Sequence, residues 1–218
     1  MILTKATVRS TTYERIKHDI IYGVLEPGLK LKLEALRDRY NASVSTLRET
    51  LNRLASEGFV VAAEQRGFFV KPVSKKDLTE IAYLRILLES SALETSIATG
   101  DADWEGNLVA AHHKLNLVEQ RMLAGDPGQV ELWKRYDWEF HKAMIQACNS
   151  DNLLSLHAII YSKYLRYQIL VLTSRGEEAV AEHRAMFDAA LARDVNGAIA
   201  ALKTHILKGL EHSRTAMS

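Results

Sequence analysis

The second half of this 218-residue sequence contains four side chains, on three predicted helices, that could bind a metal together. Asp137 and His141 are four residues apart and therefore share one side of a helix. His183 and His205 each fall within an apolar stripe of a later segment. Burying a polar group without a partner costs free energy, so inward-facing polar groups from three helices favour a single partner that they share. Three imidazoles and one carboxylate suit a divalent metal, with Zn as the first candidate and Ni, Mn or Fe as alternatives.

The same four residues allow a second interpretation, a metal-dependent hydrolase or lyase in which the ion activates water. Catalytic zinc typically keeps only three protein ligands, and no general base stands beside the four residues, so this alternative has less support. The other histidines are interpreted as ordinary core or surface residues, and the single Cys148 as a small buried hydrophobe.

Arg85 is a further candidate for chemistry because it lies on an apolar stripe with Leu78, Ile81 and Ala92. This spacing predicts a guanidinium inside the helical domain, where it needs an anion. Glu89, one turn later, could supply that anion internally. Alternatively, Arg85 clamps the carboxylate of an effector whose other oxygens bind the metal.

Six helices are predicted to position these side chains. Tyr164 and Gln168 share a face of the fourth helix and are candidates for the wall of an effector pocket. Breaks at Gly, Pro, Asn and Asp residues separate the helices. Short connections favour antiparallel neighbours, so the sequence predicts a mainly α protein whose second part is a six-helix bundle. The predicted spans are about 77–99, 103–124, 130–147, 151–173, 177–193 and 195–212.

The stretch from Leu31 to Val70 has the outline of a winged helix-turn-helix. Leu33, Leu36 and Tyr40 indicate one short helix, and a second opens at Ser43 and turns Leu47, Thr50, Leu51 and Leu54 inward before Gly58 ends it. Residues 59–62 and 68–70 are predicted to be the strands of the wing.

In such a motif the start of the second helix enters the major groove of DNA. Ser43 is a good N-cap and would present the residues that follow it to the groove. The turn of the wing carries a cation suited to phosphate or minor-groove contact. The predicted DNA-binding residues are Ser43, Ser45, Thr46, Arg48, Arg66 and Gly67.

Charge is segregated in a way that fits this interpretation. Residues 1–76 hold 14 Lys and Arg against 8 Asp and Glu, a net +6, whereas residues 77–218 hold 14 against 19, a net −5. A basic segment supplies the counterion-release term of DNA affinity.

The chain is predicted to contain a DNA-binding domain over 1–72, a linker over 73–77 and a helical domain over 78–213. Pro72 ends the wing, and Asp77 is expected to cap the first bundle helix. No apolar run approaches the length of a membrane span, and the chain has one cysteine, so we expect a cytoplasmic protein without an internal disulfide.

On these motifs the chain resembles a GntR-family transcriptional regulator with an FCD-type sensing domain. The N-terminal resemblance rests on Gly28-Leu29-Lys30-Leu31, Ser43, Leu47-Arg48-Glu49, Glu57-Gly58 and Arg66-Gly67; the C-terminal one rests on Glu80, Arg85, Leu88-Glu89, Asp137, Phe140-His141, Glu182-His183 and His205. The resemblance implies that Asp137 and the three histidines hold a divalent metal, and that Arg48 and Arg66 contact DNA.

The resemblance also has departures. Family members commonly carry Arg and Pro after the capping serine, where this chain has Val44 and Thr46, so the operator is expected to deviate from the usual half-site. With six predicted helices, the sensing domain is similar to that of the shorter, VanR-like subgroup, and this argues against a fatty-acyl ligand.

The function expected from the sequence is a homodimeric regulator, preferentially a repressor of catabolic genes, that binds a double-stranded DNA operator. A small carboxylate effector bound beside the metal would modulate that binding. A non-sensing architectural DNA binder with a purely structural histidine cluster is the remaining alternative.

Overall fold

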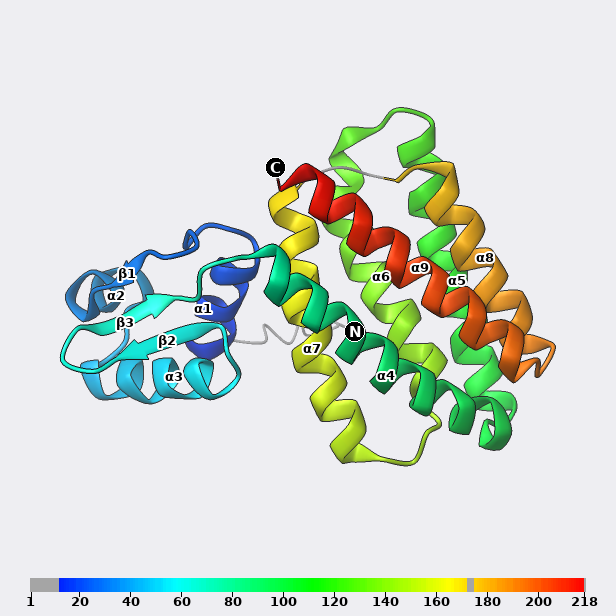
Figure 1. The fold of residues 1–218 in the computed structure, drawn as a ribbon, viewed down its shortest axis with the longest axis horizontal. Coiled ribbons are helices and arrows are strands. Elements are labelled where there is room, and N and C mark those ends of the chain that lie inside the picture. The colour runs from blue at the N-terminus through cyan, green and yellow to red at the C-terminus, as the bar shows by residue number, and fades with distance from the viewer. Residues whose placement is uncertain (1–11, 172–174, 218) are drawn as a thin grey trace, which may run out of the picture. The chain divides into compact units, whose positions relative to one another are not determined.

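The computed structural model describes residues 12–171 and 175–217, and the chain divides into two compact units, residues 1–73 and 74–218 (Figure 1). No helix in these described ranges combines the length and apolar character that a bilayer crossing requires. Each unit is built around its own apolar core.

The N-terminal unit is a winged helix-turn-helix, as predicted. It consists of α1 (Thr12–Ile21), β1 (Lys30–Leu31), α2 (Leu33–Tyr40), α3 (Val44–Ser56), β2 (Val60–Ala63) and β3 (Gly67–Val70). Helices α1 and α2 both pack on α3. The antiparallel sheet has the order β1-β3-β2, with Val60 opposite Val70 and Lys30 opposite Phe69.

Local sequence explains the ends of α3. The Ser43 side chain accepts a hydrogen bond from the Thr46 backbone N–H (3.1 Å), which satisfies one of the free donors of the first turn. Leu47, Leu51 and Leu54 are completely buried on the inner face. Gly58, with φ of +78°, then turns the chain into β2. The predicted cap and inner face of this helix are therefore confirmed.

The second unit is a helical bundle whose helices match the six predicted segments closely (Figure 1). Helix α4 packs on α6, α7 and α9, α5 packs on α6 and α8, and α8 packs on α9. The elements are α4 (Lys75–Thr99), α5 (Ala102–Leu123), the 3₁₀ turn η1 (Pro127–Gln129), α6 (Val130–Ile145), α7 (Asp151–Val171), α8 (Glu177–Leu191) and α9 (Val195–Ala216).

The expected start of α4 was wrong by two residues. Ser74, rather than Asp77, is the N-cap, and its side chain accepts a hydrogen bond from the Asp77 backbone N–H at 3.1 Å. Residues 75–77, assigned to a linker from the sequence, are therefore helical. The physical reason is that Ser and Asp both cap helices well, and the earlier of the two occupies the position here.

Candidate functional site

The metal-ligand candidates from three helices meet inside the bundle. Asp137 and His141 come from α6, His183 from α8 and His205 from α9, and all four are buried. One possible ligand atom from each lies within 4.8 Å of the others. The Nε2 atoms of His183 and His141 lie 3.1 and 3.9 Å from Asp137 Oδ1. The four-residue set predicted from helical spacing is thus assembled in one place.

Polar atoms at the centre of this cluster lack hydrogen bonds. Asp137 Oδ1, His141 Nε2 and His183 Nε2 are buried without a hydrogen-bond partner of acceptable geometry. Leaving a buried donor or acceptor unsatisfied costs about 1–3 kcal/mol each, so three such atoms facing one point call for a common partner. A divalent cation would satisfy all three at once, and the imidazole and carboxylate donors fit one.

Each histidine of the cluster is oriented by a carboxylate on its other ring nitrogen. His141 Nδ1 donates to Glu89 at 2.8 Å, His183 Nδ1 to Glu119 at 2.6 Å and His205 Nδ1 to Glu182 at 2.9 Å. Such contacts fix the ring tautomer and leave Nε2 as the free lone pair, the arrangement that metal-binding histidines need.

The electrostatics keep Asp137, His141 and His205 in their metal-binding forms, whereas His183 must release a proton. Burial would lower the pKa of His183, but Asp137 and Glu119 outweigh it and raise the pKa to about 9. Burial alone would raise the pKa of Asp137, but the nearby His183, His141 and His205 outweigh it and hold the pKa well below the usual value. Burial lowers the pKa of His205 well below its usual value, so this imidazole is neutral. The Tyr161 hydroxyl donates to the second oxygen, Asp137 Oδ2, which turns Oδ1 toward the centre.

Arg85 lies fully inside the bundle, as its place in the α4 stripe predicted. Its Nε donates to Glu89, the internal partner foreseen as one alternative. Its guanidinium also packs between the rings of Tyr161 and Tyr164, 4.5 and 4.9 Å from the centroids. Both terminal nitrogens remain buried without a hydrogen-bond partner, so Glu89 does not exhaust the donors of Arg85.

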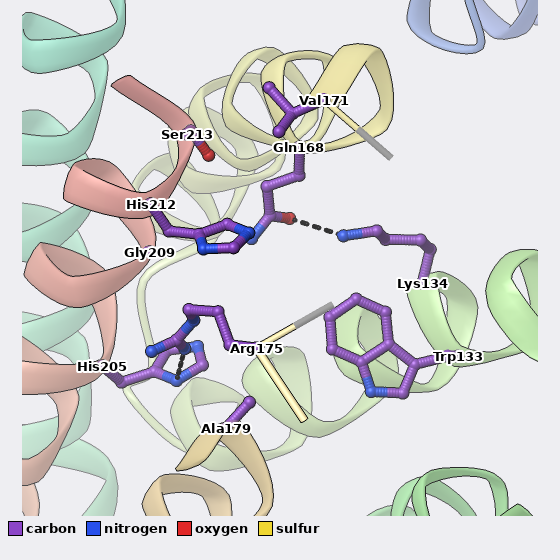
Figure 2. Close-up of a pocket in the computed structure, with 10 residues that line it drawn as sticks. All are labelled: Trp133, Lys134, Gln168, Val171, Arg175, Ala179, His205, Gly209, His212 and Ser213. Atoms are coloured by element: carbon purple, nitrogen blue, oxygen red, sulfur yellow. Dashed lines mark hydrogen bonds between the residues drawn. The ribbon is translucent and has the colours of Figure 1, made fainter. Parts of the chain in front are cut away.

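A pocket opens beside the histidine cluster, between α6, α7, α8 and α9 (Figure 2). Lys134 reaches across it to Gln168, with Nζ 3.3 Å from Oε1, and Arg175 lies against His205. Of the two predicted wall residues, Gln168 lines this pocket. Tyr164 does not; its hydroxyl donates instead to the backbone oxygen of Ile206 on α9.

The predicted DNA-binding residues occupy two exposed places in the N-terminal unit. Ser43, Ser45, Thr46 and Arg48 form the exposed start of α3. Arg66 lies in the turn between β2 and β3, and Gly67 is the first residue of β3, where its φ of +90° favours a glycine. The first place is the start of a helix and the second is the tip of the wing, and both are exposed within the unit.

Sequence reasoning missed Glu119 and Glu182 as the carboxylates that orient His183 and His205, and it missed Lys134 and Arg175 in the pocket. Glu182 adjoins His183 in the sequence, but its side chain serves His205 on another helix. Lys134 falls one turn before Asp137 on the same face of α6, a spacing that could have placed it near the cluster.

Comparison with known proteins gives consistent matches over nearly the whole chain. Residues 80–208 match the FCD domain, and residues 8–70 match bacterial regulatory proteins of the gntR family. The HTH-type transcriptional regulator BphR of Paraburkholderia xenovorans is 37% identical over 92% of this chain and 84% of its own length. The HTH-type transcriptional repressor GlaR of Escherichia coli is 29% identical over 94% and 96%. The solved structure of E. coli McbR/YncC has the same fold, with a TM-score of 0.78, 20% identity and coverage of 95% and 97%.

Proposed function

This chain belongs to the GntR family of bacterial regulatory proteins and carries an FCD domain, and from that premise we propose that it is a repressor released from its operator by a small carboxylate. The family and its relatives are DNA-binding transcriptional regulators, not enzymes. GlaR, which is related over almost its full length, is named a repressor, and this supports repression rather than activation as the mode of regulation.

The proposal includes a divalent metal held by Asp137, His141, His183 and His205. The observation that carries it is the group of three buried ligand atoms without hydrogen bonds at the centre of the bundle. When bound, the metal would supply Lewis-acidic coordination positions for carboxylate oxygens. The orienting carboxylates Glu89, Glu119 and Glu182 support zinc, because imidazoles held in a fixed orientation by such contacts are its common nitrogen ligands.

The effector is proposed to be a small carboxylate that binds beside this metal. Arg85 supports an acid because its two terminal nitrogens are buried without acceptors. A guanidinium binds a carboxylate through two parallel hydrogen bonds, which two free nitrogens allow. Gln168 and Tyr164 would complete the surroundings, Gln168 as a wall of the pocket and Tyr164 by holding the guanidinium in place.

DNA recognition is assigned to the exposed start of α3 and to the tip of the wing. Ser45, Thr46 and Arg48 would face the major groove, Ser43 would hold the end of the helix, and Arg66 and Gly67 would lie at the backbone or minor groove. Arg48 is the candidate for reading a guanine, since Arg can bond O6 and N7 together.

A homodimer is proposed because helix-turn-helix proteins bind half-sites about one DNA turn apart. The outer face of α4 exposes Tyr83, Leu84 and Leu87, with 60%, 44% and 65% of their area accessible, although the inner face of α4 is buried too. A helix that is apolar all round is normally covered on all sides. Leu156 on the adjoining α7 is also exposed (55%), so we assign this face to a second copy.

Sedimentation of Leu87→Glu tests that interface. The variant should dissociate at concentrations where the wild type is dimeric, because a carboxylate would be buried at the centre of an apolar contact. Leu117→Glu, at an exposed apolar position on α5, is the matched control and should remain dimeric. Dissociation of neither variant would place the interface elsewhere.

The whole proposal is tested by fluorescence anisotropy of the zinc-loaded protein on its own upstream DNA and on scrambled DNA, at one fixed salt concentration. A panel of small carboxylates is added to the complex. We expect preferential binding to the upstream fragment that at least one acid weakens about tenfold or more, a typical coupling between sites.

Two histidine variants test the role of the metal separately from DNA binding. His183→Ala removes a cluster ligand and should abolish the response to the acid while retaining DNA binding. His113→Ala alters an exposed histidine on α5 and should respond as the wild type does. Equal responses of the two variants would contradict the metal-linked mechanism, and equal binding to both DNA fragments would favour an architectural role.

A further inference from the structure

Lys134 is a buried cation that forms no ion pair with any carboxylate of the described residues. Only 6% of it is exposed, and within the described residues its one hydrogen-bond acceptor is the neutral Gln168 Oε1 at 3.3 Å. The ammonium also lies 4.2 Å from the Trp133 ring centroid. A neutral amide and a ring face compensate only part of the hydration that a buried ammonium loses.

The neighbouring cations differ from Lys134 because each already has its acid. Arg85 pairs with Glu89, and Arg175 pairs with Glu182 at 2.7 Å. Asp137, one turn along α6 from Lys134, directs its oxygens to Tyr161 and the histidine cluster. Within the described part of the bundle, these two arginines therefore have carboxylate partners and Lys134 does not. This difference points to an anion that comes from outside the chain.

The position of Lys134 relates this missing anion to the effector site. Lys134 and Gln168 form one end of the pocket, and His205 of the metal cluster lies at the other end (Figure 2). One ligand could therefore reach both ends. The burial of the ammonium also lowers the pKa of Lys134 to about 8, and this value still leaves it protonated at neutral pH.

We propose that the effector is a short dicarboxylate, with one carboxylate at the metal and Arg85 and the second bound by Lys134 with Gln168. This inference rests on the proposed function, because it needs the first carboxylate at the metal site. It adds a second anionic subsite and thereby narrows the effector from any small carboxylate to those with two acid groups.

The space for such a ligand depends on Trp133. The opening beside Lys134 has room for about one water molecule. Trp133 and Ala179 line both this opening and an adjoining pocket of 260 Å³. The Trp133 indole donates a long hydrogen bond to Glu119, 3.4 Å, and a rotation that breaks this bond would be needed to join the two spaces. Ligand binding should therefore change the fluorescence of Trp133.

The test is calorimetric titration of the zinc-loaded, full-length protein with straight-chain dicarboxylates of three to six carbons. Each is compared with the monocarboxylate of equal length. The wild type should bind the best dicarboxylate at least tenfold more tightly than its monocarboxylate, the effect of one charge-assisted hydrogen bond. The absence of any such preference would overturn the inference.

Two variants locate the preference at Lys134. Lys134→Met keeps the length of the side chain and removes its charge, so affinity for the dicarboxylate should fall to that for the monocarboxylate. Gln168→Glu supplies Lys134 with an internal carboxylate and should remove the preference in the same way, whether or not Lys134→Met folds. Lys142→Met, an exposed lysine on the same helix, is the control and should keep the preference.

The outcomes separate this inference from the function on which it rests. If both variants retain a tenfold preference, the second subsite is wrong although the regulator still senses acids. If no acid of either kind binds the wild type, the proposed effector function fails, and the subsite fails with it.

Discussion

Replacing Lys134 with Met should stabilise the bundle in the absence of metal and effector. Burial is the largest cause of the low pKa of Lys134; Asp137 opposes it, and Arg85 and Arg175 add to it. A pKa lowered from 10.5 to about 8 corresponds to about 3 kcal/mol of lost stability at pH 7, at about 1.4 kcal/mol per pKa unit. Methionine removes this cost.

The loss of the hydrogen bond to Gln168 offsets about 1 kcal/mol of that gain. The net expectation is about 2 kcal/mol, or a midpoint of thermal unfolding raised by about 4–8 °C for a unit of this size. All 3 tryptophans, Trp104, Trp133 and Trp138, lie in the bundle, so tryptophan fluorescence follows this unit alone. Lys142→Met is the matched control and should leave the midpoint unchanged.

The pH dependence distinguishes this cause from better packing. Between pH 8 and 10.5 the unfolded chain still holds the Lys134 proton that the native state has released, so wild-type stability rises with pH in that window. The advantage of Lys134→Met should therefore be largest below pH 8 and disappear by about pH 10.5. No stabilisation at pH 7, or a gain of equal size at both pH values, would refute the reasoning.

Three further outcomes follow from the other sites. Chelation of zinc should lower the free energy of unfolding of the bundle by about 2.7 kcal/mol when free zinc had been at 100 times its dissociation constant, and so lower the midpoint of tryptophan-detected unfolding; an unchanged midpoint would contradict a metal in the bundle. Glu57→Gln should destabilise the N-terminal unit, measured by circular dichroism. Burial would raise the Glu57 pKa, but Tyr13, Lys17 and Arg53 lower it, so the wild type should show this contribution above pH 4.5 and lose it as the pH falls through the lower native value. Arg66→Ala should reduce the salt slope of DNA binding by about one, measured by anisotropy; an unchanged slope would remove Arg66 from the interface.

The hydrophobic periodicity of the sequence was sufficient to predict much of the fold. The stripes that placed Asp137 with His141, and His183 and His205 among apolar residues, are local features of single helices, and a local pattern fixes which face turns inward. The Ser43 cap is similarly local. Two elements gave weaker signals: α1 was not assigned, and β1 is only two residues long, too short to show an alternation.

The parts of the site that were missed depend on packing between helices. Glu119 meets His183 across 64 residues, and no spacing within one helix encodes that contact. Lys134 could have been placed on the inner face of α6, but the absence of an acid beside it emerges only once all the surrounding helices are in position. Sequence patterns thus indicate which residues face inward, and tertiary structure decides which of them are satisfied.

Glu89 is shared among three partners on three helices. Its two oxygens accept hydrogen bonds from Arg85 on α4, His141 on α6 and His157 on α7. An acid that draws the Arg85 guanidinium away would leave more negative charge on the side of His141 and make that imidazole a stronger donor to the metal. Acid and metal would then strengthen each other's binding by equal factors, as linkage requires. The cell's supply of metal would accordingly set the concentration of acid to which this regulator responds.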